Sequence, residues 1–554
     1  MAEKEVRRTG PPPAPARERS HERFVLDSAH VGDIQGAFGT IRQHEEAHRG
    51  LRSRLLALLA IVGPGLIVMV GDNDAGGVAT YSQAGQNYGT SLLWVLLLLI
   101  PVLVVNQEMV VRLGAVTGVG HARLINERFG RFWGWFSVGD LFLLNFLTIV
   151  TEFIGVSLAL GYFGVSQYIS VPLAALGLVA ITATGSFRTW ERGMFVFVFA
   201  NLLVIPLFFM AHPHAGTIAH DFVVPSILGG ANSKSVLLII AIVGTTVAPW
   251  QLFFQQSNII DKRITPRWIN YERLDTWIGA FVVVIGAAAL MSVSAFAFRG
   301  TPFFGAFTNA GGTASDLSHV LGNVAGAFFA LVLLNASLIG AGALTLSTSY
   351  AFGDVFGTKA SLHRSWRDAK TFYAMFAGLV AGAAVIVLIP GAPLGLITEA
   401  VQALAGVLLP SASVFLLLLC NDPEVLGPWR NKPWLNALAS VIVAVLVLLS
   451  LILMATTVFP NINVTEFALV GGAVLFVGLG AFGLVSLWTR RHRAPAPPPP
   501  GAQVPKEQWT MAPLALLARP QWSTGRKAAM LTLRAYLVVS VVLLIVKAIQ
   551  LGGG

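Results

Sequence analysis

The sequence feature that most constrains the fold is a succession of apolar runs, each long enough to cross a lipid bilayer. There are about twelve of these runs, and they recur along almost the whole chain. They lie at roughly 55–88, 91–113, 134–160, 169–187, 191–211, 235–258, 274–298, 321–350, 371–390, 395–420, 434–459 and 464–488. Because 55% of the 554 residues are hydrophobic and only 12% are charged, a soluble globular protein is excluded. The sequence predicts an all-α polytopic protein embedded in a lipid bilayer.

The positive charge of the chain follows the predicted membrane topology. The net charge is +10, which alone could suggest a nucleic-acid partner. However, lysine and arginine gather in alternate loops, for example at 359–370 and 490–493, whereas the loops at 161–168, 391–394 and 460–463 contain neither. The positive-inside rule places the basic loops in the cytoplasm. We therefore expect an integral membrane protein with a cytoplasmic N-terminus and no nucleic-acid partner.

The apolar runs and the polar stretches between them divide the chain into six predicted parts. These are a disordered cytoplasmic leader (1–50), a first repeat with helices 1 to 5 (51–215), an inverted second repeat with helices 6 to 10 (230–420), helices 11 and 12 (430–493), a Pro-rich linker (494–525) and a terminal apolar helix (526–554). The terminal helix fits either a further span or a helix lying in the membrane interface. The division into repeats depends on two interrupted spans, the first and the sixth.

The first interrupted span lies between Gly63 and Trp94 and reads GPGLIVMVGDNDAGGVATYSQAGQNYGTSLLW. Asp72 and Asp74 stand among several glycines, and the segment contains no lysine or arginine. A carboxylate at membrane depth is costly unless a cation or water offsets it, and non-helical backbone is tolerated there only inside protein or beside a cavity. The pattern predicts an ion site in a discontinuous helix. The alternative is an ordinary polar loop between two short helices.

The sixth span, Ser235 to Ser257, is also interrupted. It contains IAIVGTTVAPWQLFFQQS, with Gly244 and Pro249 near its middle. Proline removes a backbone donor and strains the preceding turn of a helix. A proline kink alone is common, but this one follows a carboxylate-bearing interruption five spans earlier. The pair predicts two inverted repeats of five helices that face one site at the middle of the membrane.

Several segments resemble the Nramp family of divalent-metal transporters. They are GPGL (63–66), YGTSLLW (88–94), RLGAVTG (112–118), TEFIG (151–155), GTTVAPWQLFFQQS (244–257) and LPSASVFLLLLCNDPEVLG (409–427). The resemblance covers roughly residues 60–490. It implies an amino-acid-transporter-like (LeuT-type) fold, an inverted repeat of 5+5 helices with helices 1 and 6 broken and additional C-terminal helices. It also implies a metal between the two broken helices, in a protein of the bacterial plasma membrane.

The resemblance also implies candidate site residues one by one. The implied metal ligands are Asp74, at the acid of the family's DPGN, Gly71 and Thr245 through their carbonyls, and Gln402. Asp72 and Asn73 have no counterpart in the ordinary family pattern and are expected to add further oxygen ligands. The expected lining residues are Gly77, Ala248, Trp250 and Gln251, while Glu152 is either an acid on the transport path or a structural acid. Four family positions differ: Gly77 replaces an asparagine, Ala248 and Trp250 replace the methionine and histidine of MPH, and Ile149 replaces an acid. These departures resemble the Nramp-related magnesium transporters.

The types of donor favour the same cation. Soft sulfur ligands favour late transition metals, whereas carboxylate, carbonyl and water oxygens favour Mg²⁺, Ca²⁺ and Mn²⁺. Ala248 removes the thioether that the resemblance implies, although a small residue there also fits plain helix packing, and Gly77 is expected to widen the site. Mg²⁺ retains several waters and binds through one or two carboxylates. We expect Mg²⁺, and also Mn²⁺, as a partly hydrated transported substrate, without a cofactor.

The expected mechanism is alternating access without proton coupling, because Ile149 and Trp250 replace two titratable groups that the resemblance implies. The alternatives are a proton-coupled Mn²⁺/Fe²⁺ transporter of ordinary Nramp type and an organic-substrate symporter on the same fold. Asp72 and Asp74 would repel the carboxylate of an organic substrate. An enzyme is not expected, since no activated nucleophile is evident. The one cysteine, Cys420, excludes an intramolecular disulfide and a thiolate metal cluster. The sequence does not predict an oligomeric state.

Overall fold

The computed structural model describes residues 28–42, 50–391, 394–459, 462–491 and 505–517, together with parts of 530–542. Most of the predicted linker (494–525) and of the predicted terminal helix (526–554) therefore lies outside the described residues. Within them, helices predominate and two short strands form a two-stranded sheet.

The elements follow one another along the chain in a simple order. They are η1 (Ser28–His30), β1 (Ile34–Gly36), β2 (Gly39–Ile41), α2 (Leu51–Ile61), α3 (Pro64–Gly71), α4 (Ala75–Tyr88), α5 (Leu93–Thr117), α6 (His121–Phe129), α7 (Arg131–Tyr162), α8 (Gln167–Thr182), α9 (Phe187–Ala200), η2 (Asn201–Leu203), α10 (Val204–Met210), α11 (Ala215–Val223), α12 (Ser233–Thr246), α13 (Pro249–Asp261), η3 (Pro266–Trp268), α14 (Ile269–Phe298), α15 (Ala310–Leu321), α16 (Asn323–Phe356), α17 (Lys370–Val387), α18 (Leu394–Cys420), α19 (Pro423–Leu426), η4 (Gly427–Trp429), α20 (Pro433–Val458), α21 (Val464–Arg491), η5 (Lys506–Gln508) and η6 (Leu514–Leu516).

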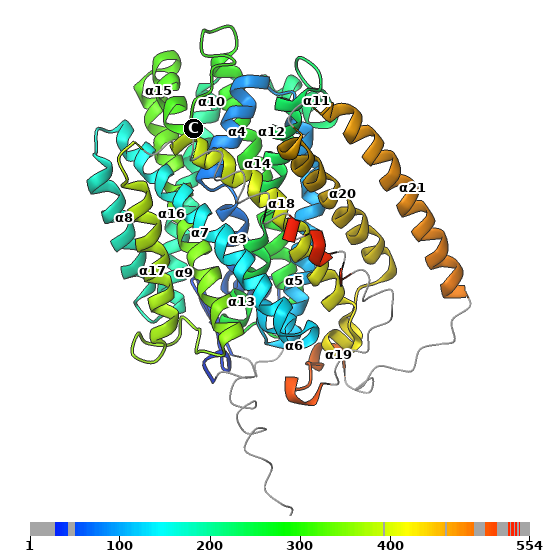
Figure 1. Ribbon diagram of the computed structural model, residues 1–554. Helices are drawn as coiled ribbons and strands as arrows, with labels where there is room; N and C mark the ends of the chain where they lie inside the picture. The colour runs from blue at the N-terminus through cyan, green and yellow to red at the C-terminus, as the bar shows by residue number, and fades with distance from the viewer. Residues whose placement is uncertain are drawn as a thin grey trace, which may run out of the picture.

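The helices confirm a polytopic membrane protein. In the described part of the chain, nine helices are long and apolar enough to cross a membrane, or up to eleven if each of two bent helix pairs is one span. The two bent pairs and α8, which has only 16 residues, correspond to the three predicted runs that the nine long helices leave out. Figure 1 shows these helices side by side, with α21 at the edge of the bundle.

The first span is interrupted as predicted, and it is also bent once more. Helix α3 ends at Gly71 and α4 begins at Ala75, so that residues 72–74 connect them outside the helices. A second bend of 50° separates α2 from α3. The start of α3 is capped from another helix, because the Asp275 carboxylate of α14 accepts hydrogen bonds from the amides of Gly63 (3.1 Å) and Gly65 (2.8 Å). A carboxylate at a helix N-terminus satisfies free amides and complements the helix dipole.

The sixth span is interrupted at the predicted proline. Helix α12 ends at Thr246, residues Val247 and Ala248 are extended, and α13 begins at Pro249. Proline suits the first position of a helix, because its missing N–H would have no helical partner there.

The structure corrects the expectation of a disordered leader over residues 1–50 for the part that it describes. Strands β1 and β2 pair antiparallel, with Ile34 opposite Ile41. Ile34, Ala37 and Ile41 are buried, and they pack within the main hydrophobic core. Figure 1 places this hairpin, in dark blue, at the lower end of the bundle; we call this the hairpin end. The burial of its apolar side chains stabilises the hairpin. The polar, proline-containing composition of the leader as a whole did not indicate such burial.

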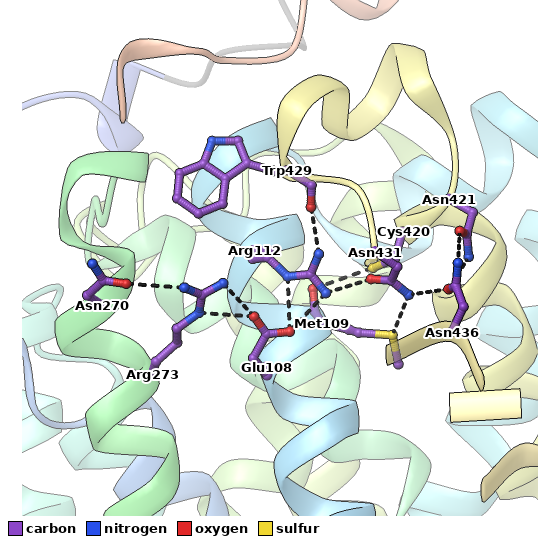
Figure 2. A network of polar contacts seen from close by, with 10 residues as sticks. All are labelled: Glu108, Met109, Arg112, Asn270, Arg273, Cys420, Asn421, Trp429, Asn431 and Asn436. Atoms are coloured by element: carbon purple, nitrogen blue, oxygen red, sulfur yellow. Dashed lines mark hydrogen bonds and ion pairs between the residues drawn. The ribbon is translucent and has the colours of Figure 1, made fainter. Parts of the chain in front are cut away.

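A polar network joins α5, α14 and the segment that follows α19 (Figure 2), and Figure 1 shows α19 at the same lower end of the bundle as the hairpin. Glu108 of α5 forms ion pairs with Arg112 (2.8 Å) and with Arg273 of α14 (2.6 Å). Arg112 also donates to the Trp429 carbonyl (2.6 Å) and to the side chain of Asn431 (2.6 Å). Glu108 thus connects α5 to α14, and Arg112 connects α5 to the loop before α20.

Candidate metal site at the helix interruptions

Asp74 directly precedes α4 and is one of the two buried acids of the first interruption. It is the N-cap of α4, and its Oδ1 accepts a hydrogen bond of 2.7 Å from the amide of Gly77. Only 3% of Asp74 is exposed. A Cβ atom at Gly77 would lie 2.8 Å from the carbonyl oxygen of Asp72. The glycine therefore permits a close approach of the α4 backbone to residue 72, and the expectation that Gly77 widens the site stays a prediction.

Glu152 of α7 lies directly beside Asp74. Its carboxyl contacts the Asp74 carboxyl, and its Oε2 accepts a hydrogen bond of 3.1 Å from the amide of Ala75. Gly340 of α16 makes room for this pair, since a Cβ there would lie 2.7 Å from Glu152 Oε2. Two carboxyls in contact inside a protein must share a proton or a cation, because two buried negative charges repel each other.

Asp72 joins the first interruption to the second. Its Oδ1 accepts a hydrogen bond from the Gln251 side chain of α13, and Gln251 Oε1 accepts one of 3.0 Å from Gln107 of α5. Asp72 is fully buried, and its other oxygen, Oδ2, has no hydrogen-bond partner. The amide chain therefore holds one oxygen of Asp72 and leaves the second available.

Asn73 is directed to a different helix. Its side-chain amide donates a hydrogen bond of 3.1 Å to the Val283 carbonyl of α14, while its Oδ1 is buried without a partner. Asp72, Asn73 and Asp74 thus contact three different neighbours. Asp72 contacts α13 of the second interrupted span and Asp74 contacts α7, whereas Asn73 is bound to α14.

The predicted residues of the second interruption are buried near these acids. Thr245 is buried, with its hydroxyl unpartnered, and Ala248 is the N-cap of α13 but has no side chain that could accept. The ring of Trp250 packs on Gly71, where a Cβ would lie 3.2 Å from Trp250 Cη2. Gln402 lies in α18, and its side chain is outside the described residues.

Two residues that were not predicted connect the interruptions or their supports. Tyr81 of α4 shares a hydrogen bond of 2.8 Å with Thr246 at the end of α12. Gln107 orients Gln251, as described above. Gln107 could have been noticed because Asn106-Gln107-Glu108 is a polar triplet within an apolar run. Tyr81 carries no comparable signal, since tyrosine is common in membrane helices.

The site has a net acidic character. Among the described residues, no basic side chain forms an ion pair with Asp72, Asp74 or Glu152. The same residues also contain no group of three or more His, Cys, Asp and Glu side chains spaced to hold a metal ion. Residues 44–48 read HEEAH, which matches the HExxH pattern of zinc sites in full, and they lie outside the described residues. Any cation here would therefore rely on carboxylates together with amide, hydroxyl, backbone or water oxygens.

Known proteins are similar to this chain in sequence and architecture. Residues 65–456 match the family described as Natural resistance-associated macrophage protein-like (Nramp). A protein named divalent metal cation transporter MntH from Burkholderia ambifaria is 26% identical over 455 residues, which cover 78% of this chain and 97% of the relative. A protein of the same name from Brucella suis is 27% identical over 437 residues, covering 73% and 91%.

Solved structures agree. A variant of the Eremococcus coleocola manganese transporter has a TM-score of 0.63 at 20% identity, covering 84% of this chain and 98% of that one. This likeness shows the fold and confirms the predicted transporter architecture. Because the family match spans well over half of the sequence, the chain belongs to the Nramp family.

Proposed function

We propose that this protein carries divalent metal cations across a membrane by alternating access, and that the ion binds where the two helix interruptions meet. The observation that supports this most is the set of three buried carboxyls, Asp72, Asp74 and Glu152, without a basic partner among the described residues. Such a group is costly in a membrane protein unless a cation or protons compensate it. The names of the relatives, divalent metal cation transporter and manganese transporter, also favour a metal cation over an organic substrate.

Within this function, we propose Mg²⁺ as the main substrate and Mn²⁺ as a second one, as in the Nramp-related magnesium transporters. The side chains around the interruptions offer oxygen rather than sulfur, because Ala248 carries only a methyl group. Oxygen-only sites with one or two carboxylates suit a partly hydrated Mg²⁺. Asp74, Asp72 with its free Oδ2, and the unpartnered oxygen of Thr245 are the proposed donors, with Gly71 contributing its carbonyl.

The proposed driving force is the membrane potential alone. A divalent cation that moves down roughly 100 mV gains about 4.6 kcal/mol, since each charge contributes about 2.3 kcal/mol. One observation favours a second candidate, the proton-coupled Mn²⁺/Fe²⁺ transporter of ordinary Nramp type. The contact between Asp74 and Glu152 could hold a proton that the arriving cation displaces.

The proposed location is a bacterial plasma membrane, with the N-terminus and the hairpin end in the cytoplasm. Arg112, Arg128, Arg263 and Arg273 all make their contacts at or near that end. This distribution supports the orientation through the positive-inside rule.

The proposal is tested by uptake into proteoliposomes under an inside-negative potential, with a pH dye inside. The wild type is compared with Asp74→Ala and with a matched control, Asp368→Ala, because Asp368 is an exposed acid that accepts only from Ser365 among the hydrogen bonds identified (2.7 Å). Mg²⁺ and Mn²⁺ are offered singly and in competition.

Each outcome decides between the candidates. Mg²⁺ uptake that is lost in Asp74→Ala, persists in Asp368→Ala and leaves the dye unchanged supports an uncoupled Mg²⁺ transporter. Mn²⁺ uptake with a matching inward proton flux, and no Mg²⁺ uptake, supports the second candidate instead. Uptake of either cation that survives in Asp74→Ala contradicts both.

A further inference from the structure

The N-terminal hairpin packs against α2 and α9 at the hairpin end of the bundle. A Cβ at Gly39 would lie 3.1 Å from the Cβ of Ala60 in α2, and one at Gly36 would fall on the Ala60 carbonyl. The hairpin tip also reaches α9, where Phe38 packs against Phe195 with ring centroids 4.6 Å apart. Backbone contact this close between the hairpin and α2 is possible only because both positions are glycine.

A buried ion pair fastens the hairpin tip to the bend of the first span. The Glu191 carboxylate of α9 accepts a hydrogen bond of 2.5 Å from the amide of Ala37 and pairs with Lys262 at 2.6 Å. Lys262 also donates to the carbonyls of Ile61 (2.7 Å) and Val62 (2.9 Å), where α2 ends. Both charged side chains are fully buried. Removing either partner would leave an uncompensated charge, which is strongly unfavourable.

The residues just before the hairpin contact the end of α13. Arg263 donates to the carbonyls of Ala29 (2.9 Å) and Asp33 (3.3 Å). His30 Nε2 lies 3.5 Å from Asp261 Oδ1. Arg263 has a φ of 67°, a left-handed conformation that costs about 1 kcal/mol or more for a residue with a side chain. This conformation belongs to the C-cap of α13, where the amides of Arg263 and Ile264 donate to the carbonyls of Ile260 (2.9 Å) and Ile259 (3.0 Å).

These contacts sit at the far ends of two short helices that lead to the candidate metal site. Helix α3, with eight residues, is about 12 Å long and runs from the bend to Gly71 and Asp72. Helix α13, with 13 residues, is about 20 Å long and runs from Pro249, next to the second interruption, to Asp261. In each interrupted span, the N-terminal segment therefore contacts one of the two half-helices at the end that lies away from the candidate metal site.

We propose that residues 28–41 form a latch that keeps the hairpin end of the transporter closed, and that this latch must detach from α2 and α13 before the cation can leave there. The latch crosses from the two interrupted spans to α9, so these elements cannot separate while it is seated. The inference rests on the proposed transport function for its uptake readout, but not for its structural readout. It assigns a role to an N-terminal segment that contacts none of the metal-site residues.

The first test locks the latch with a reversible cross-link. Gly39→Cys and Ala60→Cys are combined, since their Cβ atoms would be 3.1 Å apart and a disulfide needs about 3.5–4.5 Å, within a small adjustment. The native Cys420 is buried and does not compete. In proteoliposomes of the full chain, Mn²⁺ uptake is expected to fall at least tenfold on oxidation and to return on reduction. Each single variant, treated in the same way, is the control.

The second test releases the latch without a cross-link. Gly36→Val places a side chain on the backbone carbonyl of Ala60, which cannot move aside, so the hairpin should detach. Amide hydrogen exchange in residues 51–61 is then expected to accelerate at least tenfold. Gly50→Ala is the control, because a Cβ at Gly50 meets nothing within 4 Å, and it should exchange like the wild type.

The results separate the latch from the transport function. Uptake at the full rate in the cross-linked protein overturns the latch, as does unchanged exchange in Gly36→Val. If the reduced protein takes up neither Mn²⁺ nor Mg²⁺, the proposed transport function fails. The exchange experiment then decides the latch by itself, since it requires no transport.

Discussion

The two helix interruptions stand five spans apart and contact each other, yet they differ in chemistry. The first consists of residues 72–74, two of which are acids. The second consists of Val247 and Ala248, followed by Pro249. Within the site, the first interruption supplies the charge, whereas the second supplies an amide, hydroxyls and an aromatic wall.

The interruptions also start their following helices in different ways. Asp74 caps α4 with its side chain, so the same carboxylate serves both the fold and the candidate site. At α13, Ala248 provides no side-chain cap, and Pro249 has no N–H that needs one. Substitutions at the first interruption should therefore lower both the cation affinity and the stability of α4. Substitutions at the second should change the cation affinity by smaller amounts.

The largest effect is expected at Asp74, where two substitutions separate its roles. Asp74→Asn removes the charge but keeps a side chain that can accept from the Gly77 amide, because Asn and Asp are equally good caps. Asp74→Ala removes both and should lower the free energy of unfolding by about 1 kcal/mol more. Both variants are expected to bind Mn²⁺ at least 100-fold more weakly in calorimetric titration. Wild-type affinity in Asp74→Asn would show that the charge is not needed.

A smaller loss of Mn²⁺ affinity is expected at Gln251, which belongs to the second interrupted span. Gln251→Leu leaves Asp72 Oδ1 and Gln107 Nε2 without their hydrogen-bond partners. Each buried unpartnered group costs about 1–3 kcal/mol, so Mn²⁺ affinity should fall roughly tenfold, which corresponds to about 1.4 kcal/mol. Gln107→Leu is the matched variant, and because it acts only through Gln251 its effect on affinity should be smaller. Equal losses in the two variants would contradict the order of this chain.

Gly77 allows a test of packing alone. In Gly77→Ala the added methyl group would lie 2.8 Å from the Asp72 carbonyl, and overpacking of this kind costs about 1–3 kcal/mol of stability. The control is Gly378→Ala in α17, where a Cβ meets nothing within 4 Å, and stability should stay the same or rise slightly. Thermal unfolding in detergent measures both. A Gly77→Ala protein as stable as the control would support the expectation of an open space beside Asp74.

The sequence contained enough to predict the membrane fold and the place of both interruptions. Long apolar runs determine the spans, and Asp72, Asp74 and Pro249 mark the breaks by local chemistry. The resemblance then indicated Glu152 and Gln251, which the structure does bring beside Asp74 and Asp72. The breaks can be predicted because each depends on residues within the interrupted helix itself. Glu152 and Gln251 can be predicted because they lie in segments that the resemblance covers.

The contacts that could not be predicted join residues far apart in the chain. Asp275 caps α3 from more than 200 positions away, and Asn73 turns to α14 because Val283 accepts from it. Nothing in the local pattern around Asn73 distinguishes it from a ligand. The hairpin was missed because its strands have three residues each, too few for a clear alternation of polar and apolar residues.

The smallest effect is expected at a second hydrogen bond between the two interrupted spans, the one between Tyr81 and Thr246. Tyr81→Phe keeps the ring but removes the hydroxyl that lies 2.8 Å from Thr246 Oγ1. A neutral hydrogen bond contributes about 0.5–1.5 kcal/mol, so cation affinity should fall less than tenfold.

A double-mutant cycle with Thr246→Val isolates this contact, since both changes remove the same bond. If Tyr81 and Thr246 couple the two spans, the double variant should cost less than the sum of the single variants. Strictly additive losses in Mn²⁺ affinity would mean that the two hydroxyls act separately. The two spans would then be joined mainly through Asp72 and Gln251, so the acid of the first interruption would carry both the charge and the connection.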